Sequence, residues 1–268
     1  MINNSLKKIV QFKLKWLAKI YLAENKPYVI VISGTTGRIW LKDKIIEALK
    51  ERSFSFGANK KNFNAEIGLP LSILGLPGAE KDFEKWIKIL WKGLKSVIPS
   101  KKKKSPDYLI LEMAIDHPDD MDYLLSIVRP NAVILNGITA IYRENFESLD
   151  EIAAEYGKLI KALPWNGLAI LNTDDQRVKN LANNFAGKVI SYGCEDGADF
   201  KAFDIQKIFD GQQFKIEVQK KEREIFTKKI NRFGKHHIYA ELVKEVIKDN
   251  FKEQQKEFFG KILDMSTD

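Results

Sequence analysis

A short loop with two glycines is the first stretch of the sequence that could do chemistry. It comprises Gly34, Thr35, Thr36, Gly37, Arg38 and Ile39. Glycines allow backbone N–H groups to approach phosphate oxygens and cradle them. A phosphate loop then needs a lysine for the β- and γ-phosphates and a serine or threonine for Mg²⁺, and here Arg38 and Ile39 stand in those places. Because isoleucine offers magnesium no oxygen, the loop alone predicts either a phosphate site or an ordinary strand-to-helix turn.

Polar side chains follow two further apolar runs. Glu112 comes directly after residues 109–111, and Asn172 and Asp175 come after residues 168–171. Side chains just beyond the carboxyl ends of parallel strands lie where open α/β sheets bind ligands, so Glu112 could hold Mg²⁺. The alternative for Glu112 is an exposed charge at a strand end. The alternative for Asn172 and Asp175 is the N-cap of the next helix.

The histidines and the cysteine do not form a metal-binding pattern. His236 and His237 are adjacent, so they do not share a helix face, and the third histidine, His117, completes no HExxH spacing. The single cysteine, Cys194, excludes an internal disulfide framework and a cysteine-rich zinc site. It fits a reducing compartment, and we expect a cytoplasmic protein.

The charge of the chain is basic but dispersed. The 268 residues include 44 Lys and Arg against 36 Asp and Glu, a net charge of +8. Only residues 101–104 form a dense lysine run, which we interpret as a solvated loop. No RNP-like aromatic motif or zinc-finger spacing supports nucleic-acid recognition. No apolar run is long enough to span a membrane, and the N-terminus does not have the pattern of a secretory signal.

Hydrophobic patterns predict the elements that position these residues. Aliphatic runs predict buried strands at residues 28–32, 108–111, 132–135, 168–171 and 188–192. Helical periodicity predicts helices at 5–24, 41–52, 81–98, 119–128, 149–163, 178–184 and 236–262, with a loop and a short helix across 53–80. This alternation predicts an α/β fold with a mostly parallel sheet flanked by helices. Residues 200–230 instead predict a small antiparallel β portion with a turn at 210–211.

The N-terminal segment, residues 1–26, predicts a basic amphipathic helix. Its apolar side chains fall mostly on one face and its lysines mostly away from that face. We expect the helix to pack on the α/β domain at residues 27–268. The sequence leaves open a second interpretation, in which the helix lies on a membrane surface.

Five motifs in this order resemble one family. They are the loop at 34–39, Asn-Phe-Asn-Ala-Glu-Ile-Gly-Leu-Pro at 62–70, Leu-Glu-Met-Ala-Ile-Asp-His-Pro-Asp-Asp at 111–120, Leu-Asn-Thr-Asp-Asp at 171–175 and Gly-Lys-His-His at 234–237. From about residue 28 to 240 the sequence resembles the central, ATP-binding domain of the Mur ligases, closest to their D-alanyl-D-alanine-adding type. The resemblance implies ATP and Mg²⁺ as cofactors and acid–amino-acid ligation in cell-wall peptide synthesis, in which the γ-phosphate forms an acyl phosphate that an amine attacks.

The resemblance also implies roles for individual residues. It implies nucleotide binding by Gly34, Thr35, Thr36, Gly37, Arg38, Asn172, Asp175 and His236, a substrate loop with Asn64 and Glu66, and magnesium binding by Glu112. The sequence departs from the family at Ile39 and Tyr142, which stand where a hydroxyl residue and a histidine would ligate magnesium. Residues 114–115 read Ala-Ile in place of the family's Gly-Ala. Of the three magnesium ligands that the family implies, only Glu112 is kept.

The family also implies a UDP-sugar domain before the loop and a Rossmann-like domain after residue 240. We therefore expect the chain alone to bind neither substrate well. Three functions stay open: an impaired ligase, a non-catalytic relative that binds a partner ligase supplying the C-terminal domain, and an anion- or membrane-surface-binding module. Mg²⁺-dependent ATP hydrolysis, association with an active ligase and liposome binding would distinguish them.

Overall fold

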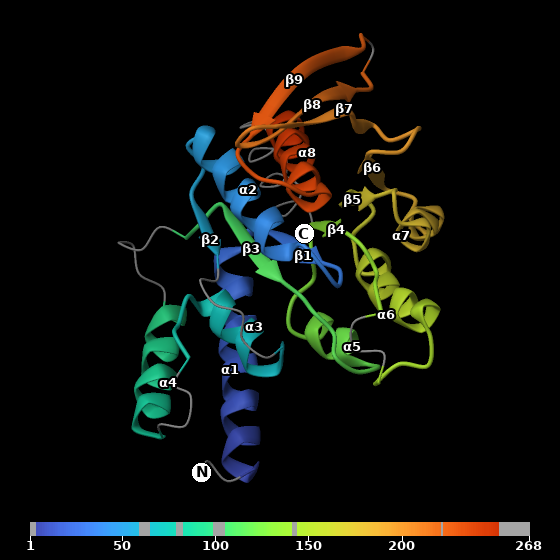
Figure 1. The fold of residues 1–268 in the computed structure, drawn as a ribbon. Helices are drawn as coiled ribbons and strands as arrows, with labels where there is room; N and C mark the ends of the chain where they lie inside the picture. The colour runs from blue at the N-terminus through green and yellow to red at the C-terminus, as the bar shows by residue number, and fades with distance from the viewer. Residues whose placement is uncertain are drawn as a thin grey trace.

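The computed structural model describes residues 4–58, 65–78, 83–98, 105–140, 144–220 and 222–251, and within these ranges it is a layered α/β structure (Figure 1). Its helices are α1 (Asn4–Asn25), α2 (Arg38–Glu51), α3 (Ala65–Leu74), α4 (Phe83–Val97), α5 (Asp120–Leu125), α6 (Leu149–Lys161), α7 (Gln176–Leu181) and α8 (Lys235–Asn250), with a 3-10 turn at Ala182–Asn184. Its strands are β1 (Tyr28–Ser33), β2 (Phe56–Ala58), β3 (Tyr108–Glu112), β4 (Ala132–Leu135), β5 (Leu168–Asn172), β6 (Lys188–Gly193), β7 (Phe200–Ile208), β8 (Gly211–Val218) and β9 (Glu224–Ile230).

The described strands form one sheet in the order β2-β3-β1-β4-β5-β6-β7-β8-β9. Every neighbouring pair from β2 to β7 is parallel, whereas β7, β8 and β9 pair antiparallel. The predicted fold class is therefore confirmed. The antiparallel portion extends the edge of the parallel sheet, with β9 as the last strand in Figure 1.

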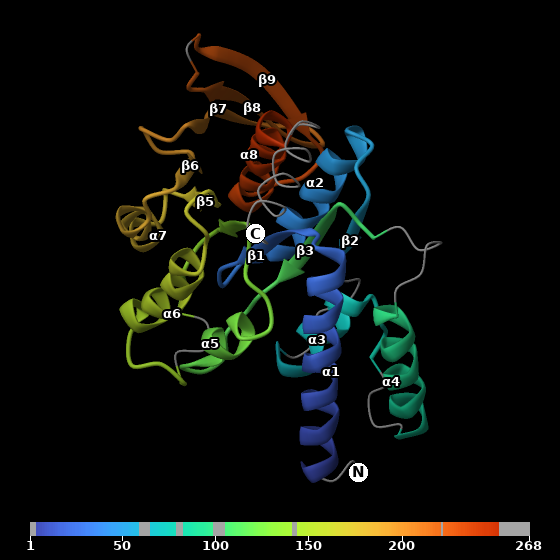
Figure 2. The same ribbon diagram turned by 180° about the vertical axis from the view of Figure 1, so that it is seen from behind.

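The two faces of the sheet bury separate hydrophobic cores. Side chains of β1 alternate between them: Val29 and Val31 face the core shared with α1, α3, α5 and α6, while Ile30 and Ile32 face the core shared with α2 and α8. Figures 1 and 2 show these two sets of helices on opposite sides of the sheet. Strands buried on both faces explain the continuous aliphatic runs in the sequence.

Helix α1 packs on the domain along one face, as expected. Val10, Leu14, Ala18 and Tyr21 are buried in the same core as side chains of β1, β3, β4 and β5. The helix contacts α3 and α4. The apolar face of α1 that the sequence pattern predicts is therefore the face that packs on the domain.

Several predicted boundaries were wrong. Helix α2 begins at Arg38 and not at residue 41, because Gly37 adopts a left-handed conformation and caps the helix there. The predicted loop over 53–80 contains a short strand, β2, in addition to the expected short helix. Helix α8 ends at Asn250, where Phe251 turns to an extended conformation and is buried, and residues 252–262 of the predicted helix lie outside the described residues.

Candidate functional site

Four parallel strands end at the same edge of the sheet. In register, Ile32 of β1 lies opposite Glu112 of β3, and Leu135 of β4 lies opposite both Ser33 of β1 and Leu171 of β5. The loop after β1, the side chain of Glu112 and the residues that follow β4 and β5 therefore meet at this carboxyl edge. The structure places loop 34–38, Glu112 and Asn172 at this one edge of the sheet.

The loop backbone needs both of its glycines. Gly34 has φ +111° and Gly37 φ +79°, in the region that side chains disfavour. A Cβ at Gly34 would lie 3.0 Å from the Gly137 carbonyl oxygen, and one at Gly37 would lie 2.6 Å from Nδ2 of Asn136. No side chain caps the N-terminus of α2. A helix start without a cap offers N–H groups to an anion, so the loop geometry suits a phosphate.

Residues after β4 anchor the loop, and the sequence interpretation missed them. The backbone N–H of Thr35 donates to the Gly137 carbonyl over 2.8 Å, and the Thr35 hydroxyl lies 2.9 Å from that of Thr139. The Thr36 carbonyl accepts a 3.0 Å bond from Nδ2 of Asn136. The strand-end rule that singled out Glu112 and Asn172 could also have found Asn136 and Thr139, because they follow the predicted strand 132–135.

A buried amide network lies below the loop. Oδ1 of Asn136 accepts bonds from Nδ2 of Asn172, over 3.1 Å, and from the hydroxyl of Tyr192, over 3.0 Å. Burial raises the pKa of Tyr192 well above its usual range, so the phenol remains a donor. Both asparagines are 3% exposed. Asn172 therefore supports the loop from below through Asn136.

Asp175 caps a helix and fixes a second loop. Its Oδ1 accepts from the backbone N–H of Arg177 over 2.9 Å, and its Oδ2 accepts from the N–H of Ile138 over 2.7 Å. The N-cap interpretation of this residue is thus confirmed. The second bond places Asp175 against the β4 loop that holds Thr35.

A carboxylate and two cations meet at the start of α2. Lys42 donates a hydrogen bond to Oε1 of Glu112, and Nε of Arg38 lies 3.9 Å from Oε2. The Arg38 guanidinium also donates to the Gly34 carbonyl, which folds it back over the loop. The three side chains are only 10–17% exposed. Lys42 follows Arg38 by four residues and so shares its helix face, which is a signal that the sequence interpretation did not use.

The described donors do not fit a magnesium ion. Mg²⁺ takes near-octahedral oxygen ligands, and Glu112 is the only carboxylate in this cluster and already accepts from Lys42. Ile39, in the first turn of α2, is 53% exposed, and its side chain has no oxygen or nitrogen that could bind a metal. Among the residues that the structure describes, no group of three or more His, Cys, Asp or Glu could hold a metal. Tyr142 lies outside those residues.

The start of α8 reaches the same region. The ring of His236 stacks on Trp40 of α2, with centroids 4.1 Å apart and planes tilted by 31°. The hydroxyl of Tyr239 donates to Asp174 over 2.7 Å, directly after β5. His236 is therefore next to the first turn of α2, whereas Glu66 hydrogen-bonds Gln11 of α1. Asn64 lies outside the described residues.

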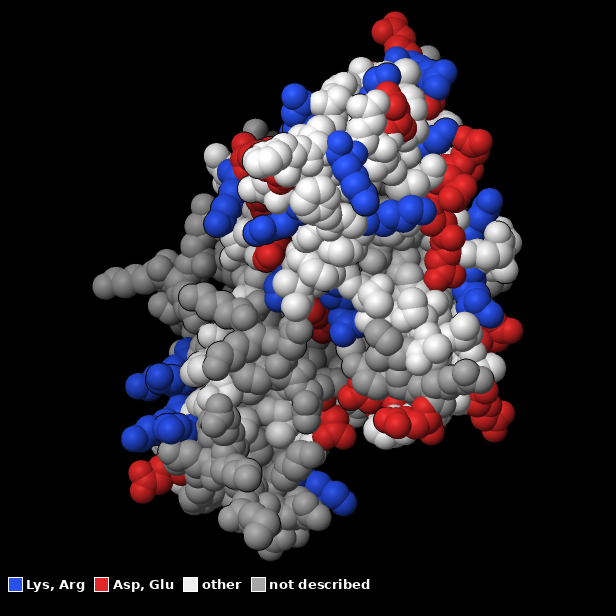
Figure 3. Space-filling view, viewed as in Figure 1, with Lys and Arg blue, Asp and Glu red and all other residues white. Residues whose placement is uncertain are grey.

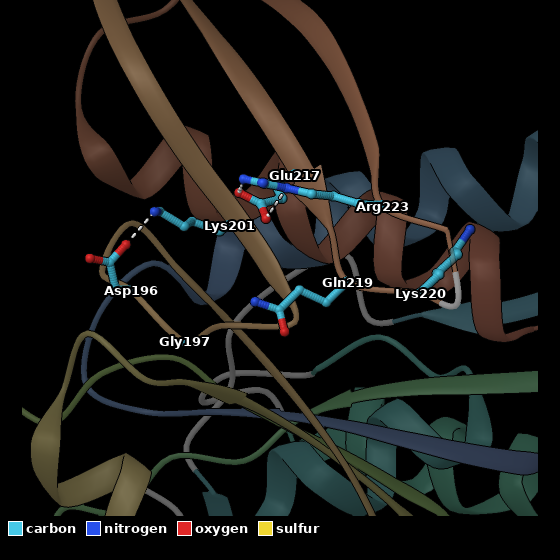
Figure 4. Close-up of a pocket in the computed structure, with 7 residues that line it drawn as sticks. All are labelled: Asp196, Gly197, Lys201, Glu217, Gln219, Lys220 and Arg223. Carbon is cyan, nitrogen blue, oxygen red and sulfur yellow. Dashed lines mark hydrogen bonds and ion pairs between the residues drawn. The ribbon is translucent and has the colours of Figure 1, made fainter.

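A hollow of about 380 Å³ lies beside β7 and β8, away from the loop (Figure 4). Its charged side chains pair with one another: Lys201 with Asp196, and Arg223 with Glu217 over 2.7 Å. Lys220 pairs with Asp249 over 2.8 Å. Each of these cations has a carboxylate of its own, whereas Arg38 and Lys42 share one, so this hollow is a poorer anion site than the loop at the start of α2.

Comparison with known proteins agrees with this architecture. The Mur ligase middle domain family matches residues 92–243, more than half of the chain. The chain belongs to this family. The matched stretch contains Glu112, Asn172, Asp175 and His236, and it begins after the loop at 34–39.

Relatives of this Mur ligase domain are named UDP-N-acetylmuramoyl-tripeptide–D-alanyl-D-alanine ligases. The UDP-N-acetylmuramoyl-tripeptide–D-alanyl-D-alanine ligase of Haemophilus influenzae is 23% identical over 203 residues, which are 75% of this chain and 38% of that protein. The Buchnera aphidicola ligase of the same name is 26% identical over 189 residues, which are 70% of this chain and 35% of that protein. This chain thus spans well under half the length of these relatives.

A solved structure has the same fold. The MurF ligase of Thermotoga maritima, solved in complex with ADP, superposes with a TM-score of 0.70 at 21% identity. The match covers 88% of this chain and 48% of that one.

Proposed function

We propose that this Mur ligase domain binds the phosphates of a nucleotide without magnesium and does not by itself catalyse ligation. One observation carries the proposal. Glu112, the magnesium ligand that the family implies, accepts from Lys42 and lies beside Arg38, while Ile39 takes the place of the hydroxyl ligand. Two fixed cations therefore provide the positive charge at the place where a metal would otherwise be held.

The arrangement suits phosphate binding better than phosphoryl transfer. The uncapped start of α2 and the charges of Arg38 and Lys42 attract an anion. Binding of ADP by the Thermotoga maritima MurF supports a nucleotide as the ligand. Forming an acyl phosphate from ATP, however, depends on a metal that bridges the β- and γ-phosphates and neutralises the developing charge. Point charges on α2 attract the phosphates without providing that bridge.

The proposal includes a role through a partner. A protein that keeps the fold and the anion-binding loop but lacks metal ligands can still bind an active ligase and alter its activity. In this role, the binding of nucleotide to this chain would control its association with the ligase. A purified UDP-N-acetylmuramoyl-tripeptide–D-alanyl-D-alanine ligase is the natural probe, because ligases of that name are similar in sequence to most of this chain. Association measured by light scattering with and without ATP would test this part alone.

Hydrolysis assays test the catalytic part. We expect no Mg²⁺-dependent ATP hydrolysis by the native chain. The variant Arg38→Lys/Ile39→Thr/Tyr142→His restores the family's ligands and is expected to bind ATP with a magnesium dependence that the native chain lacks. Magnesium-dependent turnover by the native chain would overturn the proposal, and a restored variant with unchanged affinity would show that the assignment of these positions is wrong.

A further inference from the structure

Helices α1 and α4 expose an apolar groove that the Mur ligase site does not use. The helices lie side by side below the sheet in both ribbon views (Figures 1 and 2). The groove has a volume of about 590 Å³ and is lined mainly by aromatic and aliphatic side chains. Phe12 is 65% exposed, Trp16 59% and Trp91 62%.

The groove follows from the spacing of these side chains. Phe12 and Trp16 are four residues apart on α1, as are Ile87 and Trp91 on α4, so each pair covers one face of its helix. Gly93 lets the helices approach, since a Cβ there would lie 3.0 Å from Leu17 of α1. The opposite face of α1 is already buried in the domain. A contiguous apolar surface that remains exposed to solvent marks an interaction site.

The rim of the groove is basic. Lys13 lines the groove, and the two helices carry further exposed lysines: Lys8, Lys19, Lys88, Lys92 and Lys95. The acidic residues of α1 and α4 are Glu24 and Glu84, one near an end of each helix. Figure 3 shows lysine side chains projecting at the lower left, in the area of α4. The charge of this face therefore complements an anionic surface.

We propose that α1 and α4 bind this protein to the surface of an anionic lipid bilayer. Tryptophan and phenylalanine enter the boundary between headgroups and acyl chains, and flanking lysines attract lipid phosphates. A second copy of the chain is disfavoured as the occupant, because a symmetric contact would bring the lysines of one rim against those of the other. None of the described helices is long and apolar enough to cross a bilayer. Both helices lie in the plane of the interface.

Co-sedimentation of the full chain with vesicles tests the proposal. We expect binding to vesicles of phosphatidylcholine with about 30% phosphatidylglycerol and much weaker binding to phosphatidylcholine alone. Each lysine near the surface contributes about fivefold to the partition coefficient, so Lys13→Gln/Lys88→Gln/Lys92→Gln should weaken binding by about a hundredfold. Phe12→Ser/Trp16→Ser/Trp91→Ser should weaken it at least as much.

Matched controls lie elsewhere on the surface. Trp165, which is 79% exposed in the connection between α6 and β5, is replaced by serine as the control for the aromatic residues. The control for the lysine residues replaces three exposed lysines on α6, α7 and β7 by glutamine: Lys161, Lys179 and Lys207. It removes the same charge as the triple lysine variant of α1 and α4. Both control variants are expected to bind vesicles like the native chain.

Three results would overturn the proposal. They are no sedimentation with anionic vesicles at millimolar lipid, equal losses in the control variants, and a native dimer in light scattering that the aromatic variant makes monomeric. The last result would assign the groove to a second copy. None of them bears on nucleotide binding, which is measured without lipid.

Discussion

Replacing Glu112 by glutamine separates the two roles that this carboxylate can have. If Glu112 is a magnesium ligand, the change removes a ligand and weakens the binding of MgATP. If Glu112 is instead a counter-ion to Lys42 and Arg38, the change removes a negative charge beside the phosphates and leaves two cations without their carboxylate. The site described above predicts the second outcome.

The size of the effect follows from the geometry. Arg38 in the first turn of α2 lies 3.9 Å from Glu112. A phosphate bound at this turn would lie on the order of 8 Å from the carboxylate, where two unit charges interact by about 1–2 kcal/mol at an effective dielectric constant of about 20–40. We therefore expect ATP affinity to rise by about five- to thirtyfold in Glu112→Gln. Breaking the mostly buried pair with Lys42 should cost about 3 kcal/mol of folding stability.

Isothermal titration with ATP, in EDTA and in magnesium, measures this effect, and urea unfolding measures the stability cost. Glu217→Gln is a matched control, because its side chain is 10% exposed against 12% for Glu112 and it also pairs with a cation, Arg223. We expect Glu217→Gln to lose stability without any change in ATP affinity. A fall in affinity for Glu112→Gln that occurs only with magnesium present would refute the reasoning and identify Glu112 as a metal ligand.

Three further predictions concern the framework around the site. Asn136→Ala leaves buried donors unsatisfied and should lower the free energy of unfolding in urea by about 3 kcal/mol. The half-buried Asn145, which donates one exposed hydrogen bond to the Asp116 carbonyl, should cost less than about 1 kcal/mol when it is replaced by alanine. Burial, with Asp174 nearby, raises the pKa of the Cys194 thiol to about 12, so at pH 8 a disulfide reagent should modify it about a hundredfold more slowly than free cysteine; an equal rate would contradict this. Burial opposes ionisation of Glu47, but bonds from lysines, Lys244 foremost, lower its pKa from 4.5 to about 2. Its contribution to stability is therefore complete above about pH 4.5 and is lost as the pH falls toward 2, so urea midpoints of Glu47→Gln should vary less across this window than those of the native chain.

Much of the fold could be predicted because each strand carries its own signal. Buried parallel strands require aliphatic runs, and all five predicted strands are present with boundaries within about one residue, as expected for such strongly patterned segments. Strand β2 was missed because three residues with a central glycine carry no such run. The start of α2 was misplaced because it depends on the left-handed conformation of Gly37, which composition does not reveal.

The site was predictable only in part. Strand-end logic brought loop 34–38, Glu112 and Asn172 to one edge of the sheet. It could not show that Lys42 pairs with Glu112 across 70 residues of sequence, or that His236 stacks on Trp40. These contacts are set by how α2 and α8 pack on the same face of the sheet, and no local pattern in the sequence encodes that packing.

The most direct test of the account is calorimetric titration of the purified native chain with ATP, with and without Mg²⁺. Phosphate binding by the α2 N-terminus, Arg38 and Lys42 predicts a measurable affinity in EDTA that magnesium does not increase. An affinity that rises tenfold or more with magnesium would contradict the account and restore a metal site at Glu112. An absence of binding at millimolar ATP under both conditions would contradict it as well, by showing that the loop no longer holds a nucleotide.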